Sequence, residues 1–170
     1  MAWQMTETTG KSDGNDRQER DFTTLFDTIE FADAYRSTYL AGSIARPAYE
    51  GIKRDFGIIR EEYALLACLA HFDDLTAQDV ANIGCRPRNT VSRAVHRMVA
   101  DGYIHRALDS RDGRRSRLRI TDAGRALHEK AAAYLADRQE RVLAGLDPKE
   151  RAIFSRLLRK AALHAAALED

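Results

Sequence analysis

Apolar residues recur at helical spacing along most of the chain, which predicts a mainly α-helical protein. In residues 22–54 they form one stripe, so we expect a long first helix, bent near Pro47. Residues 60–72 repeat the pattern and predict a second helix. Thr76 and, three residues later, Asp79 resemble a capping box, which predicts that a short third helix begins there.

A fourth helix and a hairpin follow. Pro87 suits the first turn of a helix and Gly102 suits the position just after its end, so the fourth helix lies between them. Residues 103–108 and 116–120 then predict two antiparallel strands around a polar tip.

The last part of the chain is again helical. Thr121 is placed to cap a fifth helix that extends to about residue 144, and the pair Asp147-Pro148 opens a sixth. A short helix, a tight turn and a second helix make a helix-turn-helix, and the hairpin adds a wing. We therefore expect a winged helix-turn-helix fold, mainly α with a small β-wing.

Length and composition are those of a globular protein. The 170 residues allow one domain with a substantial core, and 44% apolar residues are ordinary for such a domain. No apolar run approaches the roughly 20 residues that span a bilayer. Residues 1–20 are polar and lack the apolar core of a signal peptide, so we expect a disordered tail and a cytoplasmic protein without a membrane partner.

Positive charge is concentrated on the fourth helix and the hairpin. Residues 86–119 hold ten arginines and three aspartates, a net charge of +7, whereas the whole chain carries +1. Cations gathered on one supersecondary unit indicate a protein that docks on a polyanion, and duplex DNA is the best match.

The fourth helix has the two faces that a helix in the major groove needs. Val91 and Met98 lie on the apolar face, and the other face is polar. Asn can pair with adenine, Arg with guanine, and short hydroxyls hold phosphates. The alternative is a merely solvated face, which the concentration of cationic and amide groups beside a wing disfavours. The DNA-binding candidates here are Arg86, Arg88, Asn89, Thr90, Ser92, Arg93, His96 and Arg97.

The hairpin tip predicts a second DNA contact. An Arg that enters the narrow minor groove meets the enhanced negative potential of A·T-rich DNA, and Arg114 is the first choice, with Arg111 and Arg115 as alternatives. Asp109 and Asp112 are interpreted as braces that pair with a neighbouring Arg and hold the wing in one shape. The alternative is a flexible charged turn.

Two runs of residues resemble a known family. Residues 109–115 (DSRDGRR) and 118–124 (LRITDAG) are similar to the wing signature D-x-R-D-x-R…L-T-x-x-G of the multiple-antibiotic-resistance-regulator (MarR) family. Ile120 stands where Leu is common. Residues 90–93 (TVSR) and 101–104 (DGYI) fit the recognition helix and exit turn of that family.

The resemblance implies a homodimer with one MarR-type domain at residues 21–170. Residues 21–56 and 122–170 would form the helical dimerisation region, and residues 60–121 the winged helix-turn-helix. It also implies a transcriptional regulator, most members being repressors that a small ligand releases from a pseudo-palindromic operator. The ligand is often a phenol or an aromatic carboxylate, and some relatives sense coenzyme A thioesters.

The family's effector pocket lies between the dimerisation helices and the DNA-binding lobe. An anionic aromatic ligand requires a cation, an apolar wall and a phenol or imidazole, and Arg46 is the first choice for the cation. For each candidate the alternative is a core residue with a satisfied polar tip. The candidates are Tyr39, Ser43, Arg46, Tyr49, Tyr63 and His71.

The same sequence leaves other functions to consider. Cys85 lies before a helix and beside Arg86, where thiolate character is favoured, so a redox-sensing repressor is one alternative; Cys68 is interpreted as a small buried hydrophobe. A winged-helix interaction module that does not bind DNA is another, although such modules typically lack the cationic helix and wing. Without a glycine-rich phosphate loop, metal-spaced ligands or a nucleophile elbow, we expect neither an enzyme nor a cofactor or metal site.

Overall fold

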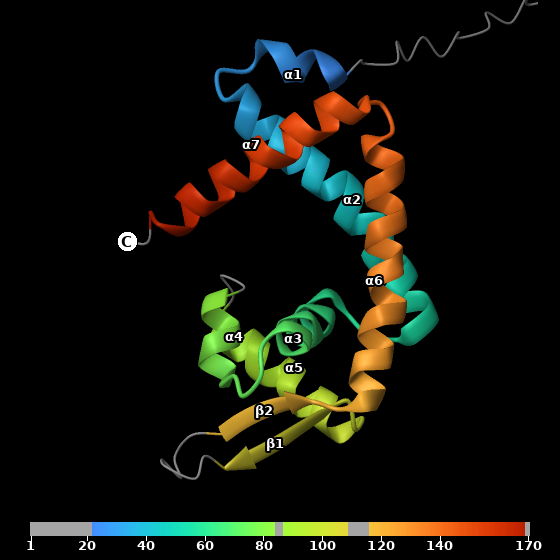
Figure 1. The fold of residues 1–170 in the computed structure, drawn as a ribbon, viewed down its shortest axis with the longest axis vertical. Helices are drawn as coiled ribbons and strands as arrows, with labels where there is room; N and C mark the ends of the chain where they lie inside the picture. Colours follow the sequence, from blue (N-terminus) through green and yellow to red (C-terminus); the bar gives the residue numbers. More distant parts are fainter. Residues whose placement is uncertain (1–21, 84–86, 109–115, 169–170) are drawn as a thin grey trace, which may run out of the picture. The chain divides into compact units, whose positions relative to one another are not determined.

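The computed structural model describes residues 22–83, 87–108 and 116–168, and these form two compact units. The first unit ends at Thr38 and the second begins at Tyr39, within one continuous helix. Figure 1 shows the elements in chain order. Helices and one two-stranded antiparallel sheet make up the regular structure of the described residues, which confirms the mainly helical fold class.

The first unit differs from the single long helix that the apolar stripe predicts. It holds a 3-10 turn (Phe22–Thr24), α1 (Leu25–Thr28) and the beginning of α2 (Ala32–Phe56). The chain is extended at Ile29, with φ −84° and ψ 141°. This break lets Phe26 contact Tyr35, with ring centroids 5.9 Å apart. The predicted continuous helix is therefore wrong at residues 29–31, whereas α2 continues through Pro47.

The core lies in the second unit. It is built by the end of α2 and by α3 (Arg60–His71), α4 (Ala77–Ile83), α5 (Arg88–Ala100), β1 (Ile104–Leu108), β2 (Ser116–Ile120) and α6 (Asp122–Leu143). α3 packs against α5 and α6, and α4 packs against α5. The largest fully buried side chains are those of Ile52, Ile58, Leu65, Leu66, Leu69, Met98, Ile104 and Leu118. Each stabilises the fold by about 1.5–3 kcal/mol relative to an exposed position, so the helix-turn-helix and hairpin share one core.

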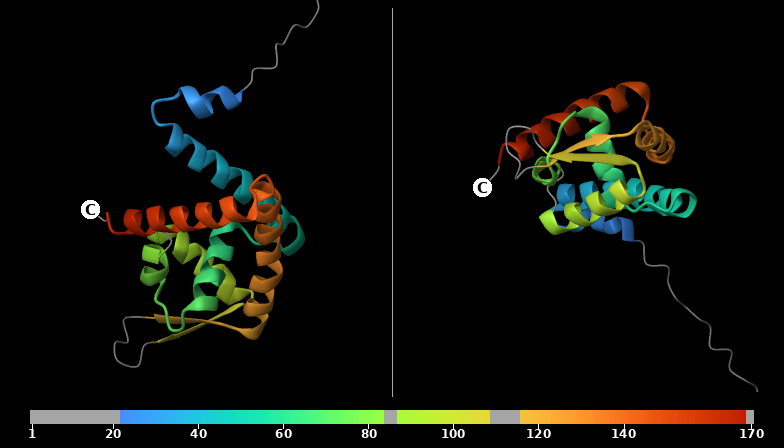
Figure 2. Two further views of the ribbon diagram at one scale, coloured as in Figure 1. Left: turned by 45° about the horizontal axis from the view of Figure 1, so that its top comes forward. Right: turned by 90° about the horizontal axis from the view of Figure 1, so that it is seen from below.

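The hairpin is anchored to the helix-turn-helix. β1 and β2 pair in antiparallel register with Ile104 opposite Ile120, and the views in Figure 2 show the two strands side by side. The N–H of Leu118 also donates to the carbonyl of Leu75 at 2.8 Å. The connection between α3 and α4 thus adds one bridge to the sheet, which fixes β2 against the turn that precedes α4.

Three predicted helix boundaries are confirmed by their hydrogen bonds. The N–H of Thr76 donates to Asp79 Oδ2 at 2.7 Å, and the N–H of Asp79 donates back to Thr76 Oγ1 at 3.2 Å. Gly102 has a φ of +76° and follows α5 as the left-handed residue of a Schellman motif. At the start of α6, Thr121 Oγ1 accepts from the N–H of Gly124 at 3.0 Å.

The last helix, α7 (Pro148–Ala166), keeps its apolar side chains in solvent. It begins where predicted, with the Asp147 carboxylate accepting two N–H groups of the first turn. None of its side chains is buried, and four of them remain at least half exposed: Ile153, Leu157, Leu158 and Leu163. α7 therefore presents an uncovered apolar stripe. Each helix among the described residues is too short or too polar for a membrane span.

Candidate nucleic-acid interface

α5 has one face in the core and one in solvent, as its sequence predicts. The inward side chains, at most 4% exposed, are those of Val91, Ala94, Val95 and Met98. The exposed side chains include those of Arg88, Asn89, Ser92, Arg93 and His96. Thr90 is half-buried at the edge, and its hydroxyl donates to the side-chain oxygen of Asn89 at 3.4 Å. Most of the predicted DNA-binding residues of this helix therefore share one accessible surface.

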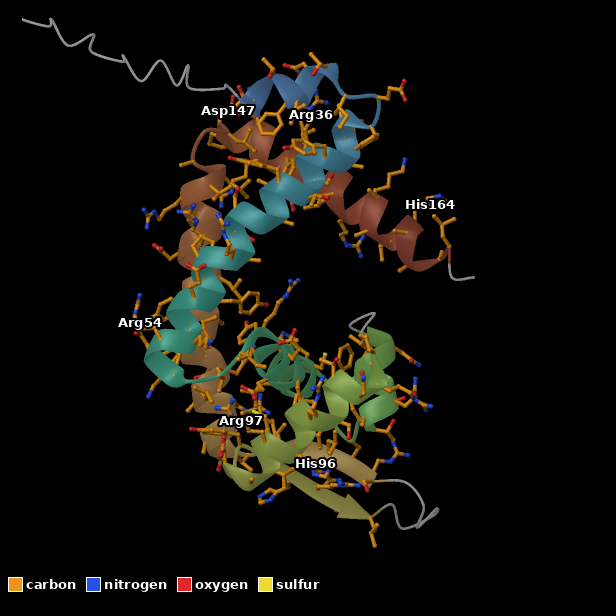
Figure 3. All side chains as sticks on the ribbon, turned by 180° about the vertical axis from the view of Figure 1, so that it is seen from behind. Arg36, Arg54, His96, Arg97, Asp147 and His164 are labelled. Carbon is orange, nitrogen blue, oxygen red and sulfur yellow. The ribbon has the colours of Figure 1, made fainter. Side chains whose placement is uncertain are left out.

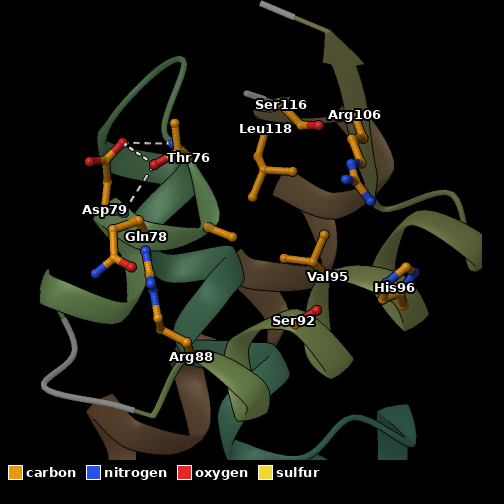
Figure 4. Close-up of a pocket in the computed structure, with 11 residues that line it drawn as sticks. Thr76, Gln78, Asp79, Arg88, Ser92, Val95, His96, Arg106, Ser116 and Leu118 are labelled. Carbon is orange, nitrogen blue, oxygen red and sulfur yellow. Dashed lines mark hydrogen bonds between the residues drawn. The ribbon is translucent and has the colours of Figure 1, made fainter. Parts of the chain in front are cut away.

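A hollow of about 380 Å³ lies between α4, α5 and the hairpin. Arg88, Ser92 and His96 line it from α5, Gln78 from α4 and Arg106 from β1, as Figure 4 shows. Guanidinium, imidazole, hydroxyl and amide groups from three elements thus converge on one concave surface. These are the groups that bind phosphates and base edges, so the surface suits duplex DNA.

Arg106 and Gln78 were not among the residues predicted to contact DNA. The position of Arg106 could have been predicted from strand alternation. Arg106 lies two residues after the buried Ile104 and therefore on the same face of the sheet. Gln78 joins the surface because α4 packs on α5, and no local pattern reveals that packing.

Arg97, which is predicted to contact DNA, binds groups of its own chain. Its Nη1 donates to Glu62 Oε1 at 2.9 Å, and its Nη2 donates to the carbonyl of Gly57 at 2.8 Å. Its Nε lies 3.6 Å from a carboxylate oxygen of Asp101. All three nitrogens therefore face groups of the same chain. Figure 3 shows Arg97 next to His96 on α5; of these two neighbours, only His96 lines the hollow.

Several predicted DNA contacts lie outside the described residues. These are Arg86, which precedes α5, and Arg111, Arg114 and Arg115 of the hairpin tip, together with the predicted braces Asp109 and Asp112. The base of the hairpin has a brace of its own: Asp74, from the loop before α4, accepts two hydrogen bonds from Arg119 at 2.5 and 2.8 Å. These bonds raise the pKa of the Arg119 guanidinium.

Asp74 also holds the hairpin through its backbone. Its carbonyl accepts from Arg117 Nη1 at 2.8 Å, and its φ of +58° is one that Asp adopts more readily than most residues. Together with Arg97, Arg117 and Arg119 account for three of the ten arginines in residues 86–119. Because these three bind groups of their own chain, the positive charge offered to DNA is smaller than the arginine count implies.

The chain resembles known DNA-binding proteins in sequence and in fold. The sequence profile of the MarR family matches residues 56–115, which span α3, α4, α5 and β1. A MarR-family transcriptional regulator from Silicibacter pomeroyi is 26% identical and covers 74% of this chain and 86% of its own, with a TM-score of 0.61. The chain is similar to MarR-family transcriptional regulators. This similarity indicates a DNA-binding transcriptional regulator and not an enzyme.

Two further relatives extend over most of the chain. The HTH-type transcriptional repressor Rv2887 of Mycobacterium tuberculosis is 25% identical over 122 residues, which are 72% of this chain and 88% of that protein. The PcaV regulator of Streptomyces coelicolor, solved in complex with its natural ligand, is 26% identical with a TM-score of 0.63. That similarity covers 82% of this chain and 96% of PcaV.

A second hollow in the chain, of about 490 Å³, brings together two of the six predicted effector residues. Arg46 and Tyr49 line it from α2, and Ile59, Arg60 and Glu61 line it from the start of α3. Lys53 and Glu50 complete its charged rim. The Arg60 guanidinium lies 5.5 Å from the centre of the Tyr49 ring, a cation–π arrangement. A cation, an aromatic wall and an apolar side chain are therefore adjacent.

Tyr63 and His71 are not among the residues that line this hollow. The Tyr63 ring contacts Tyr49 edge-on at 5.9 Å and stacks on His128 at 5.6 Å, and His128 meets His71 at 6.0 Å. Burial raises the pKa of Tyr63; burial, and then the neighbouring His71, lower the pKa of His128. Tyr63, which is 8% exposed, thus matches the alternative of a core residue, whereas His71 is exposed and its Nδ1 lies 2.8 Å from the carbonyl oxygen of Ala67.

Tyr39 and Ser43 are also outside the lining of the second hollow. Tyr39 is 56% exposed, and the carbonyl of Ser43 accepts from Arg138 Nε at 2.9 Å. Cys68 is a half-buried thiol packed against the core, as predicted, whereas Cys85 lies outside the described residues. Within the described part of the chain, no group of His, Cys, Asp and Glu side chains could hold a metal ion.

Proposed function

We propose that this MarR-family regulator is a repressor that binds a pseudo-palindromic operator as a homodimer in the cytoplasm. In each subunit α5 enters the major groove, and the hairpin tip lies against the minor groove. The observation that carries the proposal is the hollow between α4, α5 and the hairpin, where Arg88, His96 and Arg106 converge beside Ser92. The relative Rv2887, itself named a repressor, supports the sign of regulation.

The operator is found by selection from a random duplex pool, and binding is then measured against salt. Arg88→Ala is expected to weaken binding to the selected duplex and to reduce the slope of log affinity against log salt by about 1, because one phosphate contact is lost. Arg141→Ala is the matched control, since Arg141 is exposed and pairs only loosely, at 3.8 Å, with Asp137 one turn away. A pool in which no sequence is enriched, or a flat salt response, would reject the proposal.

The dimer is proposed to form through the helices that flank the DNA-binding lobe. Its support is the apolar stripe of α7, where Ile153, Leu157 and Leu158 remain at least half exposed. Burying such side chains against a second copy is favourable by about 25 cal/mol per Å². Leu157→Glu is expected to shift the protein towards monomers in sedimentation equilibrium, while Arg159→Glu on the same helix leaves the dimer intact. A Leu157→Glu protein that stays fully dimeric would contradict this arrangement.

The effector that we propose is a small aromatic anion bound in the hollow beside Arg46. Its support is the adjacency of Arg46, Tyr49 and Arg60, and the PcaV relative, which was solved with its natural ligand. A thermal-shift panel of benzoates, phenols and aromatic coenzyme A thioesters tests it. The best compound should release the selected duplex from the unaltered protein but not from Arg46→Ala. Equal release from both proteins would remove Arg46 from the site.

A further inference from the structure

Glu62 is the one charged side chain among the described residues that is buried in the core. It lies in the first turn of α3 and is 3% exposed. Its Oε2 accepts from the N–H of Ile59 at 2.8 Å, which satisfies a donor at the start of the helix. Its Oε1 accepts from Arg97 of α5 at 2.9 Å. A buried carboxylate is tolerated when it is paired and hydrogen-bonded, and both conditions are met here.

Arg97 joins this carboxylate to a third segment. Its Nη2 donates to the carbonyl of Gly57, the residue directly after α2, at 2.8 Å. Gly57 has a φ of +70°, a conformation that favours glycine and that turns the chain from α2 towards α3. One guanidinium therefore holds the end of α2 and the start of α3, and it does so from the helix that carries Arg88, Ser92 and His96.

We infer that Glu62 and Arg97 form a positioning link that sets recognition helix α5 against the α2–α3 turn, so that operator affinity depends on two residues that do not touch DNA. The inference rests on the proposed function, because α5 is taken as the helix that reads the operator. Arg97 is suited to the task because its planar fork holds a carboxylate and a carbonyl in one geometry.

The link also joins the two hollows. Ile59, whose N–H is bonded to Glu62, lines the effector hollow together with Arg60 and Glu61. On the other side, the polar residues of α5 line the hollow at the proposed DNA surface. A ligand that displaces the turn therefore acts on both partners of Arg97, and the movement reaches α5 through two short hydrogen bonds.

The test is a double-mutant cycle of Glu62→Gln and Arg97→Gln, with binding measured to the selected duplex and to a scrambled duplex. Each single change is expected to weaken selected-duplex binding by roughly tenfold, and the double variant to bind no worse than either. The salt slope and the affinity for the scrambled duplex should stay unchanged. Arg141→Gln, in an exposed pair on α6, is the matched control and should alter neither affinity.

Three outcomes would overturn the inference. The first is an additive cycle, and the second is selected-duplex affinities equal to that of the unaltered protein. The third is a salt slope that falls by about 1 in Arg97→Gln, because that would make Arg97 a phosphate contact. Amide hydrogen exchange tests the link without DNA and is measured in Glu62→Gln and in Arg97→Lys. Arg97 is half exposed, so its site tolerates a lysine. Faster exchange in residues 95–100 supports the link even if the selection enriches no sequence; unchanged exchange overturns it.

Discussion

Replacing Gly124 by Ala should destabilise the protein strongly, because this residue lies where α6 leaves the hairpin. A Cβ here would lie 2.2 Å from the carbonyl oxygen of Tyr103 and 2.9 Å from Cγ1 of Ile120. The first of these atoms is backbone and cannot rotate away. Restoring a separation of 3.0 Å requires a movement of about 0.8 Å between α6 and the start of β1.

That movement acts on a hydrogen bond as well as on packing. The carbonyl of Tyr103 accepts from the N–H of Thr121, the residue that caps α6, at 3.1 Å. Overpacking a close-packed site lowers the free energy of unfolding by about 1–3 kcal/mol, and losing a backbone hydrogen bond lowers it by about 0.5–1.5 kcal/mol. We therefore expect a loss of about 2–4 kcal/mol in Gly124→Ala.

Urea unfolding followed by circular dichroism measures this loss, at a fixed protein concentration because the midpoint of a dimer depends on concentration. Gly145→Ala is the matched control. A Cβ at Gly145 meets nothing within 4 Å, and its φ is not in the left-handed region. The control should be neutral or more stable by about 0.4–1 kcal/mol. Equal stability of the two variants would refute the steric argument.

Three further predictions concern the wing and the response to acid. Asp74→Asn keeps a residue that tolerates the left-handed φ but removes the charge that binds Arg119. Because the pair is exposed, the free energy of unfolding should change by less than about 1 kcal/mol. Binding to scrambled duplex should strengthen, and the preference for the operator should fall. A filter-binding ratio that does not change would contradict this. Arg114→Ala should weaken operator binding by about 1–3 kcal/mol without unfolding the dimer, and unchanged affinity in a salt-matched titration would reject the minor-groove contact. Hydrogen bonds from Arg54 and then from Tyr134 lower the pKa of Asp55 to about 2, from 3.8. Because the pKa is lower in the folded state, Asp55 stabilises the fold above about pH 4, and this contribution is lost as the pH falls towards 2. In acid unfolding, Asp55→Asn should therefore lose less stability over that interval than the unaltered protein, and an identical loss would exclude the effect.

The charge on the helix-turn-helix and wing illustrates how far residue counting reaches. Ten arginines in residues 86–119 are visible in the sequence and indicate a polyanionic partner. Which of them can bind that partner depends on residues elsewhere in the chain. Glu62 lies 35 positions from Arg97, and Asp74 lies 45 positions from Arg119. A charged side chain gives no local sign of such a partner, so the sequence does not reveal that Arg97 pairs with Glu62 or that Arg119 pairs with Asp74.

The effector candidates show the same limit in a different form. The six candidates come from the region where the family resemblance implies an effector pocket. Arg46 and Tyr49 line the hollow, whereas Tyr63 and His71 do not. The Tyr63 ring instead packs on rings of α2 and α6. Spacing along one helix does not specify which neighbouring helix covers a ring.

The boundaries at Thr76, Gly102 and Thr121, the hairpin and the two faces of α5 follow from short-range chemistry, and the amino-acid sequence predicted them correctly. A capping Thr, a left-handed Gly102 and a 3.6-residue period act over a few residues, so their effect is readable without the fold. The brace at Asp74 and the pairing of Arg97 with Glu62 depend on contacts between distant segments. Such contacts select one of several orientations that the local chain allows, and that selection comes from packing and pairing in the folded protein.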